Sequence, residues 1–125
     1  LEFYKWIKSR GKIFLDIPSW LDCCSSMDLS LGSRFHGNMI SFQAGSPALV
    51  LYHDSRTKEL ADTTLLPSIP WSEAVKSSSL ENILGRLSFD GSKYDLRRRE
   101  LAGLLRDYLN AAGIQTSTGL NMLSA

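Results

Sequence analysis

The sequence has few cysteines, and the two that it has, Cys23 and Cys24, are neighbours. Adjacent Cα atoms lie about 3.8 Å apart, whereas unstrained disulfides need roughly 4.4–6.8 Å, so a bond between the two would be strained. No further cysteine can complete a disulfide framework, and this favours a reducing compartment. A vicinal redox pair is one interpretation, and two small residues on the inner face of a helix is the simpler one.

A strong excess of either charge is also missing, because 14 Lys and Arg residues stand against 13 Asp and Glu residues. Dedicated nucleic-acid and membrane-surface proteins are usually strongly basic, so the balance argues against both kinds of partner. The longest apolar run covers residues 48–52, far short of the roughly 20 residues that cross a bilayer. Residues 1–10 are too charged for a signal peptide. We therefore expect a cytoplasmic protein without a transmembrane segment.

The composition that remains is ordinary for a globular protein, with 43% hydrophobic and 22% charged residues in a chain of 125. This composition argues against intrinsic disorder and predicts one compact domain, which we place at residues 1–113. Residues 114–125 are polar and lack periodicity, so we expect a flexible C-terminal tail. Leu1 is an unusual first residue, which suggests that the chain is a piece of a longer polypeptide.

Segments with a helical period alternate with short apolar segments that read as strands. The expected helices cover residues 1–10, 18–27, 37–44, 55–63, 73–76, 80–87 and 94–112. The expected strands cover residues 12–17, 28–32, 48–52 and 65–69. This order predicts an α/β fold with a parallel sheet, and we expect the apolar face of the last helix to pack on the domain. Ligands of such sheets bind at the carboxyl ends of the strands, where helices begin.

The first strand-to-helix junction combines a helix start with an anion-binding residue and a titratable one. Ser33, Arg34, His36, Gly37 and Asn38 lie here, directly after an expected buried strand. The first turn of a helix presents unpaired N–H groups to an anion. A guanidinium suits a carboxylate or phosphate, and an imidazole transfers protons near neutral pH. The pattern by itself is also compatible with a capping serine, a surface ion pair and a structural histidine.

The second junction follows the strongest expected strand and is rich in ionisable residues. His53, Asp54 and Arg56 lie within it, together with Lys58 and Glu59. Each of them has a simple structural explanation, such as a helix cap for Asp54 or a solvated charge for Arg56. If the two junctions follow neighbouring strands, however, their side chains line one cleft. No spacing of histidines, cysteines or acidic residues indicates a metal site.

Residues 32–60 resemble the polysaccharide pyruvyl transferase family in three elements that follow each other in order. These elements are Ser33-Arg34-Phe35-His36-Gly37, Gly45-Ser46-Pro47 and His53-Asp54-Ser55-Arg56, with an apolar strand before the last one. The close match covers about a quarter of the chain. The resemblance implies a Rossmann-like, three-layer lobe of a two-lobed fold like that of the GT-B glycosyltransferases.

The resemblance also implies a function, namely the transfer of pyruvate from phosphoenolpyruvate to two sugar hydroxyls as a ketal, in the synthesis of exopolysaccharides or cell-surface glycans. It assigns donor chemistry to Arg34 and His36 as catalytic residues, and it requires no cofactor beyond the donor substrate. Ser33, Gly37, Asn38, His53, Asp54 and Arg56 are then expected to bind substrate. Because such enzymes are longer, we expect this chain to be the C-terminal, donor-binding lobe, inactive without an N-terminal, acceptor-side lobe.

Two other functions stay open at this stage. A GT-B-type glycosyltransferase lobe that binds a nucleotide sugar would share the architecture, since a fold does not dictate its chemistry. Such a site needs a carboxylate for the ribose, and Asp54 is the nearby candidate. The third possibility is a non-catalytic interaction module that uses the long C-terminal helix with Arg97, Arg98 and Arg99.

Overall fold

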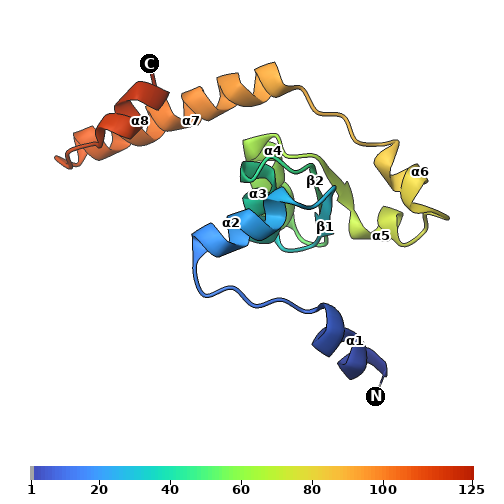
Figure 1. The fold of residues 1–125 in the computed structure, drawn as a ribbon. Coiled ribbons are helices and arrows are strands. Elements are labelled where there is room, and N and C mark those ends of the chain that lie inside the picture. Colours follow the sequence, from blue (N-terminus) through green and yellow to red (C-terminus); the bar gives the residue numbers. More distant parts are fainter. Residues whose placement is uncertain (1) are drawn as a thin grey trace.

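The computed structural model describes residues 2–125 and shows a mixed α/β protein built around a small parallel sheet (Figure 1). The strands are β1 (Ser30–Gly32), β2 (Ala48–Tyr52) and β3 (Ser68–Pro70). The helices are α1 (Glu2–Arg10), α2 (Ile17–Ser25), α3 (Phe35–Gln43), α4 (Ser55–Thr64), α5 (Trp71–Ala74), α6 (Leu80–Leu84), α7 (Gly91–Ala111) and α8 (Thr118–Leu123). The sheet and α2–α4 form the centre, with α1 on one side and the α7–α8 arm on the other.

The three strands lie in the order β1-β2-β3, and both strand pairs are parallel. Gly32 pairs with Val50, and Tyr52 pairs with Pro70. Parallel neighbours require a crossover segment, and α3 and α4 supply the two crossovers. All three strands therefore end at the same edge of the sheet.

Side chains alternate between the two faces of β2, and each face has its own hydrophobic cluster. Val50 is fully buried and packs with Ala61 of α4 and Leu66, flanked by side chains of α3. Leu49 and Leu51 point to the opposite face and pack with residues of β3 and α5. Helices thus lie on both faces of the sheet, as expected for strands that are apolar throughout.

The predicted strand over residues 48–52 is confirmed with the same bounds, and the predicted helix around residues 37–44 is confirmed as α3. Gly45 ends that helix with a φ of +88°, a conformation that glycine adopts without a steric penalty. The predicted helix over residues 1–10 is confirmed as α1 over the described residues, with Leu1 outside them. The strand predicted over residues 65–69 corresponds to β3, which lies slightly later, at Ser68–Pro70.

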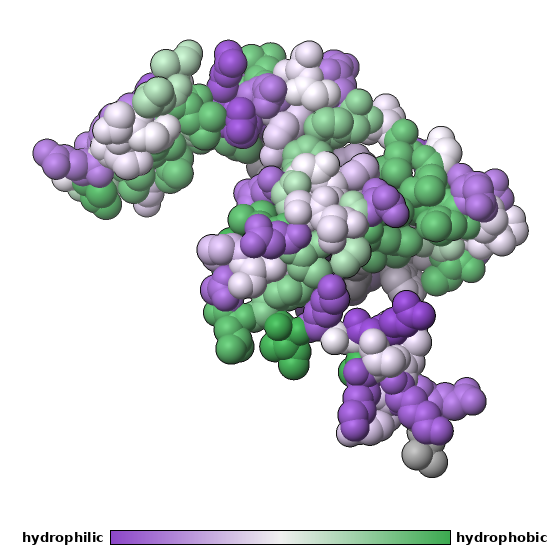
Figure 2. Space-filling view, in the orientation of Figure 1, coloured by the Kyte–Doolittle hydropathy of each residue, from purple (hydrophilic) through white to green (hydrophobic). Residues whose placement is uncertain are grey.

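The prediction of a strand over residues 12–17 is wrong. The Asp16 side chain accepts a hydrogen bond from the Ser19 backbone N–H at 2.8 Å, so Asp16 caps a helix that begins at Ile17. Ile13 and Leu15 are 90% and 96% exposed. Figure 2 shows hydrophobic side chains on the surface where this link between α1 and α2 lies. The segment is largely apolar in the sequence, but among the described residues no strand pairs with it.

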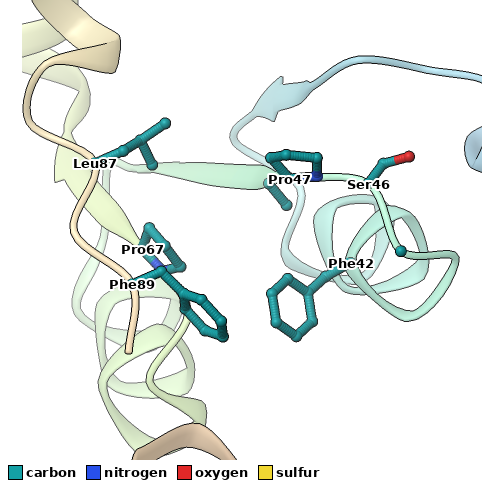
Figure 3. A pocket seen from close by; sticks show the side chains of 8 residues that line it. Phe42, Ser46, Pro47, Pro67, Leu87 and Phe89 are labelled. Atoms are coloured by element: carbon teal, nitrogen blue, oxygen red, sulfur yellow. The ribbon is translucent and has the colours of Figure 1, made fainter. Parts of the chain in front are cut away.

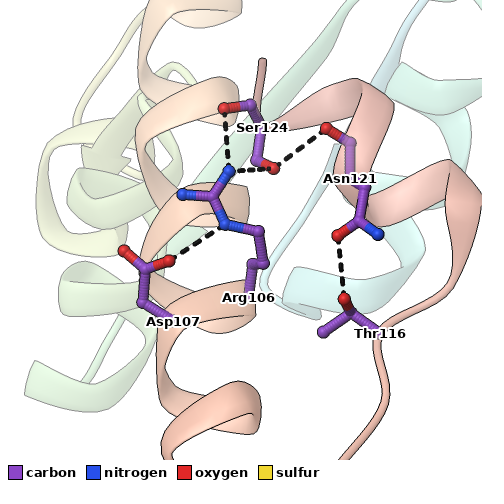
Figure 4. A network of polar contacts seen from close by, with 5 residues as sticks. All are labelled: Arg106, Asp107, Thr116, Asn121 and Ser124. Atoms are coloured by element: carbon purple, nitrogen blue, oxygen red, sulfur yellow. Dashed lines mark hydrogen bonds and ion pairs between the residues drawn. The ribbon is translucent and has the colours of Figure 1, made fainter.

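The predicted flexible tail contains a helix, α8, which packs against α7. Arg106 of α7 donates to the hydroxyl of Ser124 at 2.9 Å and to its backbone carbonyl at 3.4 Å (Figure 4). The Arg106 Nε donates to Asp107 at 2.9 Å, which holds the guanidinium in place. The division of the chain into a domain of residues 1–113 and a tail stays a prediction.

The expected packing of the long helix on the domain is correct only near its beginning. The centres of the Tyr94 ring and the Phe42 ring of α3 lie 4.8 Å apart. The Arg97 Nε donates to the Thr63 carbonyl at 3.0 Å. Further along α7, Leu104 and Tyr108 are exposed, because the helix extends away from the centre (Figure 1). Within residues 2–125, no helix is both long and apolar enough to cross a membrane.

Candidate functional site

The carboxyl edge of the sheet gathers three strand-to-helix junctions side by side. The first joins β1 to α3, the second joins β2 to α4, and the third joins β3 to α5. Because β1 and β2 are neighbours, the structure confirms that the two junctions singled out from the sequence lie next to each other. This is the edge at which α/β sheets bind ligands.

The first junction presents a helix start to solvent. Arg34 is the N-cap residue of α3, but its side chain makes no capping hydrogen bond, and the first turn contains no acidic residue. Arg34 and His36 are both exposed, whereas Ser33 and Gly37 are half-buried. The His36 ring lies edge-on to the Phe35 ring, with 5.8 Å between the ring centres. The N–H groups of this turn and the guanidinium are thus available to an anion.

Asn38 holds the loop of the first junction together from inside. Its side chain is 2% exposed, and its amide nitrogen donates to the carbonyls of Gly32 and Arg34 at 2.8 and 3.0 Å. Its amide oxygen accepts from the Ser30 hydroxyl at 2.9 Å. Asn38 was predicted to bind substrate, and in the structure its amide is occupied with positioning the backbone on both sides of Ser33.

The second junction is organised by Asp54. One carboxylate oxygen accepts from the Thr57 backbone N–H at 2.6 Å, which caps α4. The other lies 3.4 Å from the Nε2 atom of His53. The pKa of the Asp54 carboxyl is lowered, mainly by the hydrogen bonds from Thr57, with smaller contributions from the charges of His53 and Arg56. Asp54 is therefore a carboxylate near neutral pH, with one edge turned to an imidazole.

A cavity of about 410 Å³ lies between the second and third junctions. It is lined by Tyr52, His53, Asp54, Ser55, Lys58, Pro70, Trp71 and Ser72. The volume is in the range of small-molecule sites. His53 and Asp54, predicted from the sequence, line this cavity, whereas Arg56 and the residues of the first junction do not.

Sequence reasoning missed the contribution of the third junction, which brings Trp71 and Ser72 to the cavity. The signal that could have found them is their position directly after a strand, at the same edge as the other two junctions. Lys58 was noticed only as part of a charged run. In the structure it bonds to Asp62, whose hydrogen bond and charge raise the pKa of Lys58, and it lies 5.9 Å from the centre of the Tyr52 ring.

A second cavity lies at the opposite, amino edge of β2 and β3. It is lined by Phe42, Gly45, Ser46, Pro47, Ala48, Pro67, Leu87 and Phe89, and it also has a volume of about 410 Å³. The Phe42 and Phe89 rings point toward each other, with 5.1 Å between the ring centres (Figure 3). The Ser46 hydroxyl is already bonded to the carbonyl of Cys24 at 2.6 Å. With no titratable side chain in its lining, this cavity offers nothing for proton transfer or anion binding.

Of the two cysteines, Cys24 lies on the inner face of its helix, as the simpler interpretation expects. Cys24 of α2 is buried against α3, where its Sγ accepts from the Ser41 hydroxyl at 3.3 Å. Cys23 is half-buried, and both thiols are free. Within residues 2–125, no three side chains of histidine, cysteine, aspartate or glutamate are close enough to hold a metal ion together.

Comparison with known proteins confirms the resemblance over part of the chain. Residues 2–55 match the family described as polysaccharide pyruvyl transferase. The matched region covers fewer than half of the 125 residues and includes α1, α2, β1, α3 and β2. It contains the whole first junction and ends inside the second, just after Asp54. No curated protein and no solved structure matches the chain.

Proposed function

We propose that this chain is part of a polysaccharide pyruvyl transferase and that it binds the donor, phosphoenolpyruvate, at the first junction. The observation that carries the proposal is the start of α3, where an exposed Arg34 adjoins a first helical turn that has neither an acidic residue nor a side-chain cap. This junction lies inside the region that matches the family. The donor-binding, C-terminal lobe of a GT-B-like enzyme is the architecture that we propose for the chain.

The chemistry of the donor suits these groups. Phosphoenolpyruvate carries a carboxylate and a phosphate, and a guanidinium together with the N–H groups of a helix start can bind both. The helix start also carries a partial positive charge of about half a unit, which adds to the charge of the guanidinium and favours an anionic ligand.

The transfer itself requires the movement of protons. A proton is added to the methylene carbon of the donor, and the adjacent carbon then accepts one sugar hydroxyl. Phosphate leaves, the second hydroxyl bonds to the same carbon, and both hydroxyls lose their protons. In this proposal His36 serves as the acid or the base in one of these steps, since an imidazole is a common proton donor and acceptor in enzymes.

Two alternatives make different demands on the same edge of the sheet. A glycosyltransferase lobe would bind a nucleotide sugar, and a non-catalytic module would bind neither ligand. Ligand-induced thermal stabilisation separates them, because only a ligand that binds the folded state raises the melting temperature. We expect phosphoenolpyruvate to stabilise the chain and nucleotide sugars to leave it unchanged.

The proposal is tested directly by calorimetric titration of phosphoenolpyruvate into the wild-type chain and Arg34→Ala. We expect the substitution to weaken binding by about tenfold or more, because a charge-assisted hydrogen bond to an anion contributes roughly 1.5–3 kcal/mol. Arg98→Ala is the matched control, since Arg98 is an exposed arginine of α7 paired with Asp95. Equal affinity in wild type and Arg34→Ala would overturn the assignment of the donor site.

A further inference from the structure

We propose that the cavity between the second and third junctions binds a neutral pyranose ring, the acceptor sugar, with the Trp71 indole as its stacking surface. This inference rests on the proposed function, because it identifies the site of the second substrate. It also refines one expectation, since the separate N-terminal lobe was expected to be the acceptor side. In this proposal the chain itself contributes the surface that holds the sugar.

Trp71 is the first reason. It begins α5 directly after β3, and it is 49% exposed although Ala74 in the same short helix is buried. Among the described residues, no other aromatic ring stacks on its indole. An exposed indole beside a cavity offers a flat, rigid and apolar face. One face of a pyranose ring consists largely of C–H groups, which pack on such a surface.

The polar side chains of the cavity are the second reason. A pyranose that stacks through its C–H face directs its hydroxyls outward, where they need donors and acceptors. The Asp54 carboxylate, the His53 imidazole and the Ser72 hydroxyl line the cavity. Each carboxylate oxygen has two acceptor positions. Asp54 therefore keeps capacity for a sugar hydroxyl beyond its bond to Thr57 and its contact with His53.

The charge of the cavity favours a neutral ligand over an anion. Lys58 is the one lysine in the lining, and its ammonium group is bonded to Asp62. The Asp54 carboxylate repels a second anion. At the first junction the balance is reversed, because Arg34 has no ion-pair partner among residues 2–125. The neighbouring ends of β1 and β2 thus offer adjacent places for an anionic donor and a neutral acceptor.

The test is an NMR titration of the 125-residue chain with methyl β-D-galactopyranoside and methyl α-D-mannopyranoside. At least one glycoside is expected to shift the indole N–H resonance of Trp71 and the ring resonances of His53. In Trp71→Ala, the His53 shifts should require about tenfold more glycoside, whereas Trp71→Tyr keeps a ring and should bind nearly as well. Trp6→Ala is the matched control, because Trp6 is an exposed tryptophan of α1 away from the cavity.

Three results would overturn the inference. They are the absence of any shift at Trp71 with both glycosides, equal shifts with the acyclic polyol sorbitol, and shifts at Trp71 with phosphoenolpyruvate in place of the sugars.

The same sample separates this inference from the proposed function. Glycoside shifts at Trp71 without phosphoenolpyruvate binding at Arg34 support the sugar site and reject the donor site, and the opposite result rejects only the sugar site.

Discussion

Asp54 has two roles at the scale of a single residue, because the same carboxylate caps α4 and lines the cavity. Its lowered pKa means that the folded state binds a proton less readily than the unfolded state. The stability that the carboxylate contributes is therefore fully present above its ordinary pKa of 3.8 and is lost as the pH falls through the lower folded value.

We expect Asp54→Ala to lower the melting temperature by a few degrees at neutral pH, because the Thr57 N–H loses its partner. Asp54→Asn should keep most of the cap and lose its pH dependence. The measurement is a series of thermal unfolding curves between pH 2 and 7, with Glu59→Gln as a control for loss of a negative charge on the same helix. A difference between wild type and Asp54→Ala that stays constant across this range would contradict the prediction.

Residue-level reasoning from the sequence found part of the candidate site. The positions of Arg34, His36, His53 and Asp54 followed from the rule that parallel strands end at one edge. The occupied amide of Asn38 could not be predicted, because hydrogen bonds to Gly32 and Ser30 depend on how the loop folds back. Trp71 was missed because its importance arises only from the pairing of Tyr52 with Pro70, which brings the third junction beside the second.

At the scale of elements, α8 depends on α7. A six-residue helix is not stable alone in water, because helix nucleation is unfavourable and few bonds follow it. The bonds from Arg106 to Ser124 and the packing on α7 supply what the local sequence lacks. The polar composition led to the prediction of a tail, because it gives no sign of the contact between residues 18 positions apart that joins α8 to α7.

We expect Arg106→Ala to shift the Cα resonances of residues 118–123 toward random-coil values, because α8 loses its polar attachment to α7 (Figure 4). NMR chemical shifts of the wild-type chain and the variant provide the measurement. Arg98→Ala removes the same charge from α7 at a position bonded to Asp95 and should leave α8 unchanged. Unaltered helical shifts in Arg106→Ala would show that α8 is held without Arg106, by its Ser117 cap and its packing on α7.

The fate of two apolar segments shows what the sequence determines at this scale. Both residues 48–52 and residues 12–17 have strand-like patterns, but only the first lies between two partners, β1 and β3. The run from Ala48 to Leu51 is buried on both faces, which fixes it as a central strand. In the other segment, the cap at Asp16 starts a helix within the predicted strand. Strand propensity is realised only where a partner is available.

At the scale of the whole molecule, the two hydrophobic clusters lie in the centre, and in α7 only Ala102 is buried among the described residues. The clusters connect the sheet with α3, α4 and α5. Leu31 of β1 shares a face with Leu49 through their pairing, yet it is exposed, so that face is covered only in part. Figure 2 shows hydrophobic surface over several parts of the molecule. Resistance to local opening should follow this distribution of burial.

We therefore expect amide hydrogen exchange to be slowest in β2 and fastest in residues 12–15 among the described parts of the chain. Within residues 2–125, the N–H groups of residues 12–15 have no backbone partner, whereas β2 is bonded on both sides. Exchange followed by mass spectrometry on peptides that cover both segments is the measurement. Protection of residues 12–15 equal to that of β2 would mean that the segment is paired in solution.

The Asn38 amide has a thermodynamic consequence for any ligand of the first junction. Three hydrogen bonds fix the backbone between Ser30 and Arg34 before a ligand arrives. Binding there does not have to order a mobile loop, so little conformational entropy is lost and even a small anion can be held with useful affinity.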